Sequence, residues 1–232
     1  MKRTDDQLLK IKEIAFIGKV TYSLSHEIKN ILATINESSG LMGDLLIKGG
    51  QGKILDLTRL AQLNINMQEQ VKRGVDIVKR LNRFAHSMDE EASYSDLNDI
   101  ILLTVDIAKR LARLKGVGLE TIPTNNPIIN IHDDPFKIEQ ILFGCIEYLL
   151  DLPAKKTLIS ITARQNKDDT SIIISDDSSR VSPSCGDNGI EKTSDLQMTF
   201  LNILMNEIGG SVNFIQSQSG NTITLSLPLK PP

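Results

Sequence analysis

The chain has 232 residues, enough for two domains, and 40% of them are hydrophobic, which is sufficient for packed cores. Its net charge of −3 comes from mixed basic and acidic residues without a basic stripe, which argues against nucleic acid as the main partner. The N-terminus lacks the apolar core of a signal peptide, and no apolar run reaches the roughly 20 residues that span a bilayer. With two isolated cysteines and no Cys/His cluster, we expect a reduced, cytoplasmic protein without a metal site.

The first predicted element is a long amphipathic helix from about Asp5 to Ile47. Read in heptads, its apolar seam contains Leu24 and Ile28, and in that register His26 falls on the opposite side, so His26 is expected to face solvent. Imidazole is a good nucleophile near neutral pH, and its phosphoramidate transfers readily. An outward histidine in this position is therefore a candidate phosphate carrier.

Ser25-His26-Glu27-Ile28-Lys29-Asn30 resembles the H-box of two-component sensor histidine kinases. The resemblance implies that His26 accepts the phosphoryl group, that Glu27 acts as base and that Asn30, one helical turn beyond His26, helps to orient the reaction. The family usually has proline after this residue, and this chain has Ile31. We therefore expect the helix to lack the usual kink, because proline removes a backbone donor and clashes with the preceding turn.

A second long helix is predicted from about Lys53 to Met88, after a glycine-rich break at residues 49–52. Its heptads place Val71, Gly74 and Val78 in the seam. Two such helices cannot bury a full apolar stripe against each other alone, so a two-fold dimer that forms a four-helix bundle is predicted. An intramolecular hairpin covered by a second domain is the alternative.

Residues 91–232 form the second predicted domain, separated from the hairpin domain (1–90) by a polar junction near residue 90. Helices and short alternating strands follow one another and end in a hairpin, which is typical of an α/β sandwich with helices on one face of a mixed sheet. Helices are expected at 97–114, from Asp134-Pro135 to Leu150 and at 196–208, with loop from 176 to 194. Strands are expected at 118–122, 128–132, 157–163, 170–175, 211–216 and 222–227.

The order of these elements resembles the ATP-binding domain of the same kinases, which has the Bergerat ATPase fold. The residues that such a site needs are largely replaced. Gly144 and Tyr148 stand where the family has two asparagines, one of which holds Mg²⁺. Asp176 keeps the adenine-contacting acid, but Ser178 and Arg180 replace two glycines, and Asp195 stands in a segment that should be glycine-rich before a helix.

A phosphohistidine helix without a working ATP site resembles the histidine phosphotransferases built on a degenerate kinase scaffold, the ChpT type. This predicts a phosphorelay protein that moves phosphoryl groups between receiver-domain aspartates through His26. No cofactor is expected on this chain, since Mg²⁺ would come from the receiver. The expected partners are response-regulator receiver domains, the receiver of a hybrid histidine kinase and a second copy, with Ser23 and Lys29 at the docking surface. A divergent ATP-dependent histidine kinase and a non-catalytic dimeric adaptor remain alternatives.

Overall fold

A computed structural model describes residues 2–89, 93–123, 129–152, 155–166, 169–178, 188–217 and 220–228. The chain divides into two compact units. Residues 18–83 form the hairpin unit, and residues 1–17 with 84–232 form the α/β unit. No helix among the described residues is long and apolar enough to cross a membrane.

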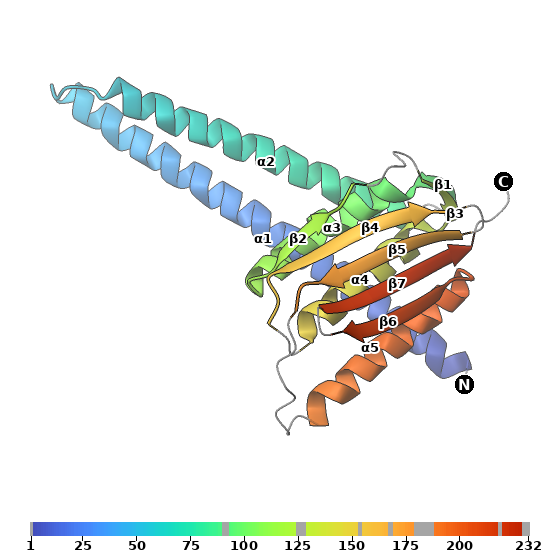
Figure 1. Cartoon of the computed structure of the whole chain (residues 1–232). Coiled ribbons are helices and arrows are strands. Elements are labelled where there is room, and N and C mark those ends of the chain that lie inside the picture. The colour runs from blue at the N-terminus through green and yellow to red at the C-terminus, as the bar shows by residue number, and fades with distance from the viewer. Residues whose placement is uncertain are drawn as a thin grey trace. The chain divides into compact units, whose positions relative to one another are not determined.

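The hairpin unit consists of parts of two long helices, α1 (Lys2–Gly50) and α2 (Leu57–Asp89), which run antiparallel (Figure 1). The turn between them contains Gly52, whose φ of 82° lies in the left-handed region that favours glycine. Asp56 then caps α2, because its Oδ1 accepts a hydrogen bond from the backbone N of Arg59 at 2.9 Å. As expected from Ile31, α1 continues as helix past the H-box-like segment.

The two helices face each other along a narrow apolar seam. Leu24 and Ile31 are buried on α1, as predicted, and Leu63 and Ile77 are buried on α2. Val71, Gly74 and Val78, which the heptad pattern placed in the seam, line the groove between α2 and α1, and Val78 is 47% exposed in the single chain. Ile77, which the pattern left out, is 3% exposed, so α2 carries apolar residues on two adjacent faces.

The α/β unit contains a five-stranded sheet in the order β2-β4-β5-β7-β6. Its strands are β2 (Gly118–Thr121), β4 (Leu158–Gln165), β5 (Asp169–Asp176), β6 (Ser211–Ser217) and β7 (Gly220–Pro228). The β2–β4 pair is parallel and the other pairs are antiparallel, so the sheet is mixed, as predicted. A separate antiparallel ribbon joins β1 (Ser93–Asp96) to β3 (Asn130–Asp133).

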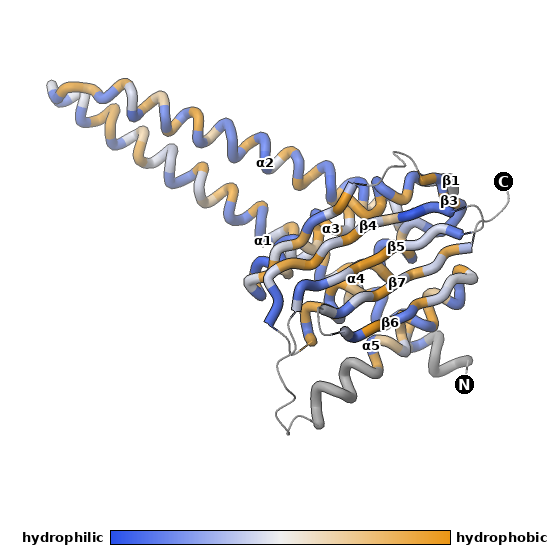
Figure 2. Tube along the Cα trace, viewed as in Figure 1, coloured by the Kyte–Doolittle hydropathy of each residue, from blue (hydrophilic) through white to orange (hydrophobic). Residues whose placement is uncertain are grey.

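Three helices, α3 (Leu97–Leu114), α4 (Pro135–Asp151) and α5 (Asn188–Glu207), cover one face of the five-stranded sheet (Figure 1). Alternate strand residues such as Ile159, Ile172 and Leu225 point into the core between the layers. Figure 2 shows this alternation as hydrophobic and hydrophilic segments along the strands. The predicted helical hairpin followed by an α/β sandwich is therefore confirmed.

Four phenylalanines pack together in the α/β unit, and one of them, Phe16, belongs to α1. The ring of Phe16 lies 5.5 Å from that of Phe84, 5.6 Å from that of Phe136 and 5.1 Å from that of Phe143, measured between centroids. All four rings are at least nine-tenths buried. Offset and edge contacts of this kind stabilise aromatic clusters. The end of α2 from Phe84 onward and the part of α1 that contains Phe16 are thus part of the α/β unit.

The structure departs from the expected elements in two places. The ribbon strand β1 was not predicted, because its four residues are mostly polar and follow an acidic junction. The segment from 176 to 194 was expected to be loop throughout, but α5 already begins at Asn188. Its first residues lack the apolar periodicity by which helices are recognised, so the prediction began at Leu196 instead.

Candidate functional site

His26 lies in the middle of α1 and is half-buried. Asn30, one turn later, places its Nδ2 3.2 Å from His26 Nδ1. Tyr22, one turn earlier, holds its ring 6.2 Å from the imidazole, centroid to centroid, with the planes inclined by 55°. Residues at i−4 and i+4 therefore frame the imidazole along one face of the helix.

The amide of Asn30 can select which imidazole nitrogen is free to react. A neutral imidazole carries its proton on one nitrogen and a lone pair on the other. A half turn of the amide brings Oδ1 to the position of Nδ2, where it accepts a hydrogen from Nδ1. That tautomer leaves a lone pair on Nε2, on the side of the ring away from Asn30.

The other residues predicted at this site lie around His26 on the same helix. Glu27 is half-buried and takes part in other interactions, so its role as a base stays a prediction. Ser23 is half-buried, and Lys29 is exposed. Ser23 stands three residues before His26 and Lys29 three residues after it, so both lie next to His26 on the helix surface.

In the α/β unit, Asp176 is the centre of a closed hydrogen-bond network. Its Oδ1 accepts hydrogen bonds from Ser178 N at 3.1 Å, Ser178 Oγ at 2.6 Å and Asn221 N at 2.9 Å. Its Oδ2 accepts one from Asn221 Nδ2 at 2.9 Å. Asn221 Nδ2 also lies 3.0 Å from Ser178 Oγ. All three residues are buried, so the carboxylate is satisfied by donors of its own chain.

These contacts set the ionisation of Asp176. Burial raises the pKa of the carboxyl group, but the hydrogen bonds from Ser178 and Asn221 together outweigh burial, and the pKa lies below its usual value. Gly220 lets the strand approach closely: its φ is 136°, and a Cβ there would lie 2.0 Å from the backbone oxygen of Asp176. Only glycine fits this approach.

A buried lysine stands beside the network. The Nζ of Lys156 donates to the backbone oxygens of Leu149 and Leu152, the latter at 3.2 Å, and lies 3.9 Å from Asp176 Oδ2. Burial lowers the pKa of Lys156, and the negative charge of Asp176 opposes this only in part. The ammonium group caps the carbonyl end of α4, where a cation is favourable.

On α4, Gly144 and Tyr148, which the resemblance to the kinases matches with two asparagines, are packed against other residues of the chain. A Cβ at Gly144 would lie 2.9 Å from Leu201 Cδ2, and Gln197 Nε2 donates to the Gly144 oxygen at 2.9 Å. Tyr148 is buried and makes an edge contact with Phe214, with ring centroids 5.2 Å apart. Neither position offers an oxygen ligand suited to Mg²⁺.

Arg180 lies outside the described residues. Asp195 lies in α5, but its side chain is outside the part of the chain that the structure describes. Among the described residues, no group of three or more His, Cys, Asp and Glu side chains could hold a metal ion.

Sequence reasoning missed Lys156, Asn221 and Leu201, which complete the surroundings of Asp176 and Gly144. Asn221 and Lys156 lie far from Asp176 in sequence, and no local motif marks them. One signal could have revealed Asn221: it is a polar residue directly before the strand predicted at 222–227, whose apolar residues are buried. Strand pairing brings it next to Asp176, since β5 pairs with β7.

No protein-family model matches the chain. Over 175 residues it is 22% identical to the sensor histidine kinase ZraS of Salmonella typhimurium, in an alignment that covers 75% of this chain and 36% of ZraS. The chain thus spans about a third of the length of this curated relative. In sequence the chain is thus similar to part of a sensor histidine kinase, and its fold is a helical hairpin followed by an α/β sandwich.

Two solved structures that match the chain are those of histidine kinases. AdeS of Acinetobacter baumannii matches with 13% identity and a TM-score of 0.48, over 84% of this chain and 96% of that one. The histidine kinase ThkA in complex with the response regulator TrrA matches with 16% identity and a TM-score of 0.48, over 99% of this chain and 66% of that one.

Proposed function

We propose that the chain is a phosphorelay histidine phosphotransferase that shuttles phosphoryl groups between receiver-domain aspartates through His26 without using ATP. The main support for this proposal is the environment of the Asp176 carboxylate. In the resembling kinases the corresponding acid reads adenine. Here four hydrogen bonds from Ser178 and Asn221 reach the carboxylate, three at Oδ1 and one at Oδ2, and its side chain is 0% exposed, which leaves no access for an adenine ring.

The remaining ligand positions support the same conclusion. A Mg·ATP site needs an oxygen ligand for the metal and room for the phosphates. Position 144 has no side chain and is packed by Leu201, and Tyr148 is turned into the hydrophobic core against Phe214. The described residues therefore do not fit Mg·ATP, and no step of the proposed reaction uses it.

In the proposed reaction, the Nε2 lone pair of His26 forms a bond to the phosphorus of a receiver aspartyl phosphate. The bond from phosphorus to the aspartate oxygen breaks, and its electron pair stays on the receiver carboxylate. The imidazole then loses its Nδ1 proton to water, and the second transfer reverses these steps on another receiver. Catalysis is a matter of positioning, with Mg²⁺ held by the acidic pocket of the receiver. The reaction takes place in the cytoplasm, among response regulators and hybrid kinases.

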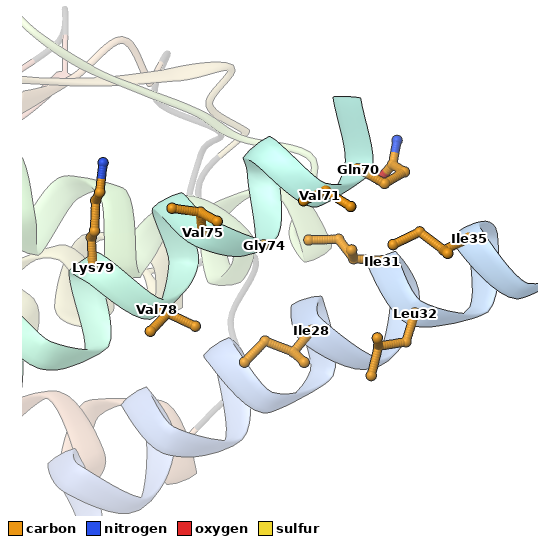
Figure 3. Close-up of a pocket in the computed structure, with 10 residues that line it drawn as sticks. All are labelled: Ile28, Ile31, Leu32, Ile35, Gln70, Val71, Gly74, Val75, Val78 and Lys79. Carbon is orange, nitrogen blue, oxygen red and sulfur yellow. The ribbon is translucent and has the colours of Figure 1, made fainter. Parts of the chain in front are cut away.

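A second copy is the proposed partner of the hairpin unit. An open groove of about 380 Å³ runs between α1 and α2, lined by apolar side chains with Gln70 and Lys79 as its polar members (Figure 3). Its α1 residues Ile28 and Ile35 lie about 180–200° around the helix from His26 at 3.6 residues per turn. Packing a second hairpin into this groove would form a four-helix bundle and leave His26 on the outer surface.

The test is transfer in the absence of ATP. A panel of isolated receiver domains is labelled on aspartate with radioactive acetyl phosphate, freed of donor and mixed with the chain. Acid-labile, base-stable label on His26 is the expected result, with none on His26→Gln. Label that appears only with ATP would establish a kinase instead. A His26→Gln protein that still passes phosphate between receivers would establish an adaptor.

A further inference from the structure

Aromatic side chains are scarce in this chain and almost all are buried. There are six phenylalanines, three tyrosines and no tryptophan. All six phenylalanines and Tyr148 are buried or half-buried. Tyr22 is the most exposed of the nine aromatic residues, at 66%, and it is the one whose ring lies next to the imidazole of His26.

Tyr22 belongs to the outer face of α1. Lys19, Tyr22, His26, Lys29 and Ala33 follow one another at intervals of three and four residues, so they share one side of the helix. The apolar groove opens on the opposite side, through Ile28 and Ile35. A second copy in the groove would therefore not cover Tyr22.

Positive charge lies on this same face, although the whole chain has a net charge of −3. Lys19 and Lys29 are both exposed, and each stands three residues along the helix from Tyr22 or His26. A partner with an acidic surface would be complementary to these two lysines.

We infer that Tyr22 is the anchor through which a receiver domain docks at His26. The inference rests on the proposed function and names the contact through which it operates. Tyrosine supplies a large, rigid contact surface at low entropic cost and is enriched among interface residues that dominate binding energy. The acidic pocket of a receiver, which surrounds the phosphoaspartate, is the partner chemistry that Lys19 and Lys29 complement.

The experiment compares Tyr22→Ala, Tyr22→Phe and a matched control, Tyr94→Ala. Tyr94 is also exposed, at 59%, and its ring lies 4.7 Å from another imidazole, that of His132. Labelling of His26 is followed against the concentration of acetyl-phosphate-labelled receivers. Separately, His26 is labelled with phosphoramidate, a small donor that needs no docking surface.

For Tyr22→Ala we expect the half-saturating receiver concentration to rise at least about tenfold, the effect of losing an interface anchor, with the maximal rate within about twofold. Labelling by phosphoramidate should be unchanged. Tyr22→Phe should retain most of the receiver affinity because the ring remains, and Tyr94→Ala should match the unaltered chain.

Three results would overturn the inference. In the first, Tyr22→Ala saturates at the same receiver concentration as the unaltered chain, which would leave the proposed function standing. In the second, phosphoramidate labelling falls as much as receiver labelling, which would make Tyr22 a support for the imidazole. In the third, no receiver labels the unaltered chain although phosphoramidate does, which would remove the proposed function as well.

Discussion

Asn221 contacts the carboxylate of Asp176 with both its backbone and its side chain. The backbone N donates to Oδ1 and Nδ2 donates to Oδ2, each at 2.9 Å. The two residues are 45 positions apart and meet because β5 pairs with β7. A buried carboxylate is stable only when such donors replace water, so this pair decides whether the charge can remain in the core.

Replacing Asn221 with alanine should therefore destabilise the protein. Oδ2 loses its hydrogen bond in a buried position, and an unsatisfied buried acceptor costs about 1–3 kcal/mol in free energy of unfolding. Urea denaturation followed by circular dichroism measures the change. Asn213→Ala is the matched control, because Asn213 is an exposed strand residue, and it should stay within about 0.5 kcal/mol. Equal losses from both substitutions would contradict the assigned role.

Stability should fall in acid, and Asp176 should account for part of the fall. Its pKa is lower in the folded protein than in the unfolded chain, where a free aspartate titrates near about 3.9. Its contribution is therefore complete above that value and is lost as pH falls through the folded pKa. The pKa of Asp177 is lowered in the same direction, by hydrogen bonds from Thr157 and Leu158 that outweigh burial.

Asp176→Asn checks this assignment, because an amide does not titrate. The variant should be less stable at pH 7, since its amide NH₂ meets the donors of Asn221, and its free energy of unfolding should change less between pH 6 and pH 3. Urea titrations at each pH give both quantities. An unchanged pH dependence in the variant would place the acid sensitivity in other carboxylates.

Introducing asparagine at position 144, as the resemblance to the kinases suggests, should not create nucleotide binding. Even a Cβ at Gly144 would lie 2.9 Å from Leu201 Cδ2, so Gly144→Asn overpacks this contact and should cost roughly 1–3 kcal/mol in stability. Isothermal titration with Mg·ATP should show no heat of binding. Combining the change with Leu201→Ala should relieve the overlap but still leave Asp176 occupied. Binding by the single variant would show that one missing ligand was the whole defect.

Substitutions in the apolar groove of the hairpin unit test the proposed dimer. Val75 lines the groove and is 49% exposed in the single chain. Val75→Glu should raise the dissociation constant of the dimer at least about 100-fold, because a carboxylate buried in an apolar interface costs several kcal/mol. Light scattering after size exclusion measures the mass. Ala33→Glu, on the His26 face, should remain dimeric. A dimer that survives Val75→Glu would move the interface elsewhere.

The sequence predicts the elements of this fold better than their contacts. The two long helices and the strand around Ile172 and Ile174 follow from periodicity, since each buries one regular face. The burial of Ile77 on α2 could not be predicted, because it stands outside the heptad seam, next to the equally apolar Val78. Likewise, the acid at 176 and the glycine at 144 are visible in sequence, but the donors from Asn221 and the packing by Leu201 come from distant segments.

The hydrogen bonds around Asp176 also bear on how the protein responds to the energy state of a cell. A ligand that binds only the folded chain raises its stability by mass action, so a nucleotide-dependent domain is better folded when nucleotide is abundant. Asp176 has its partners built into the chain, and its share of the stability does not depend on the concentration of any small molecule. A relay built on such a domain would keep the same folded population during starvation. A kinase that nucleotide stabilises would then lose part of its folded population.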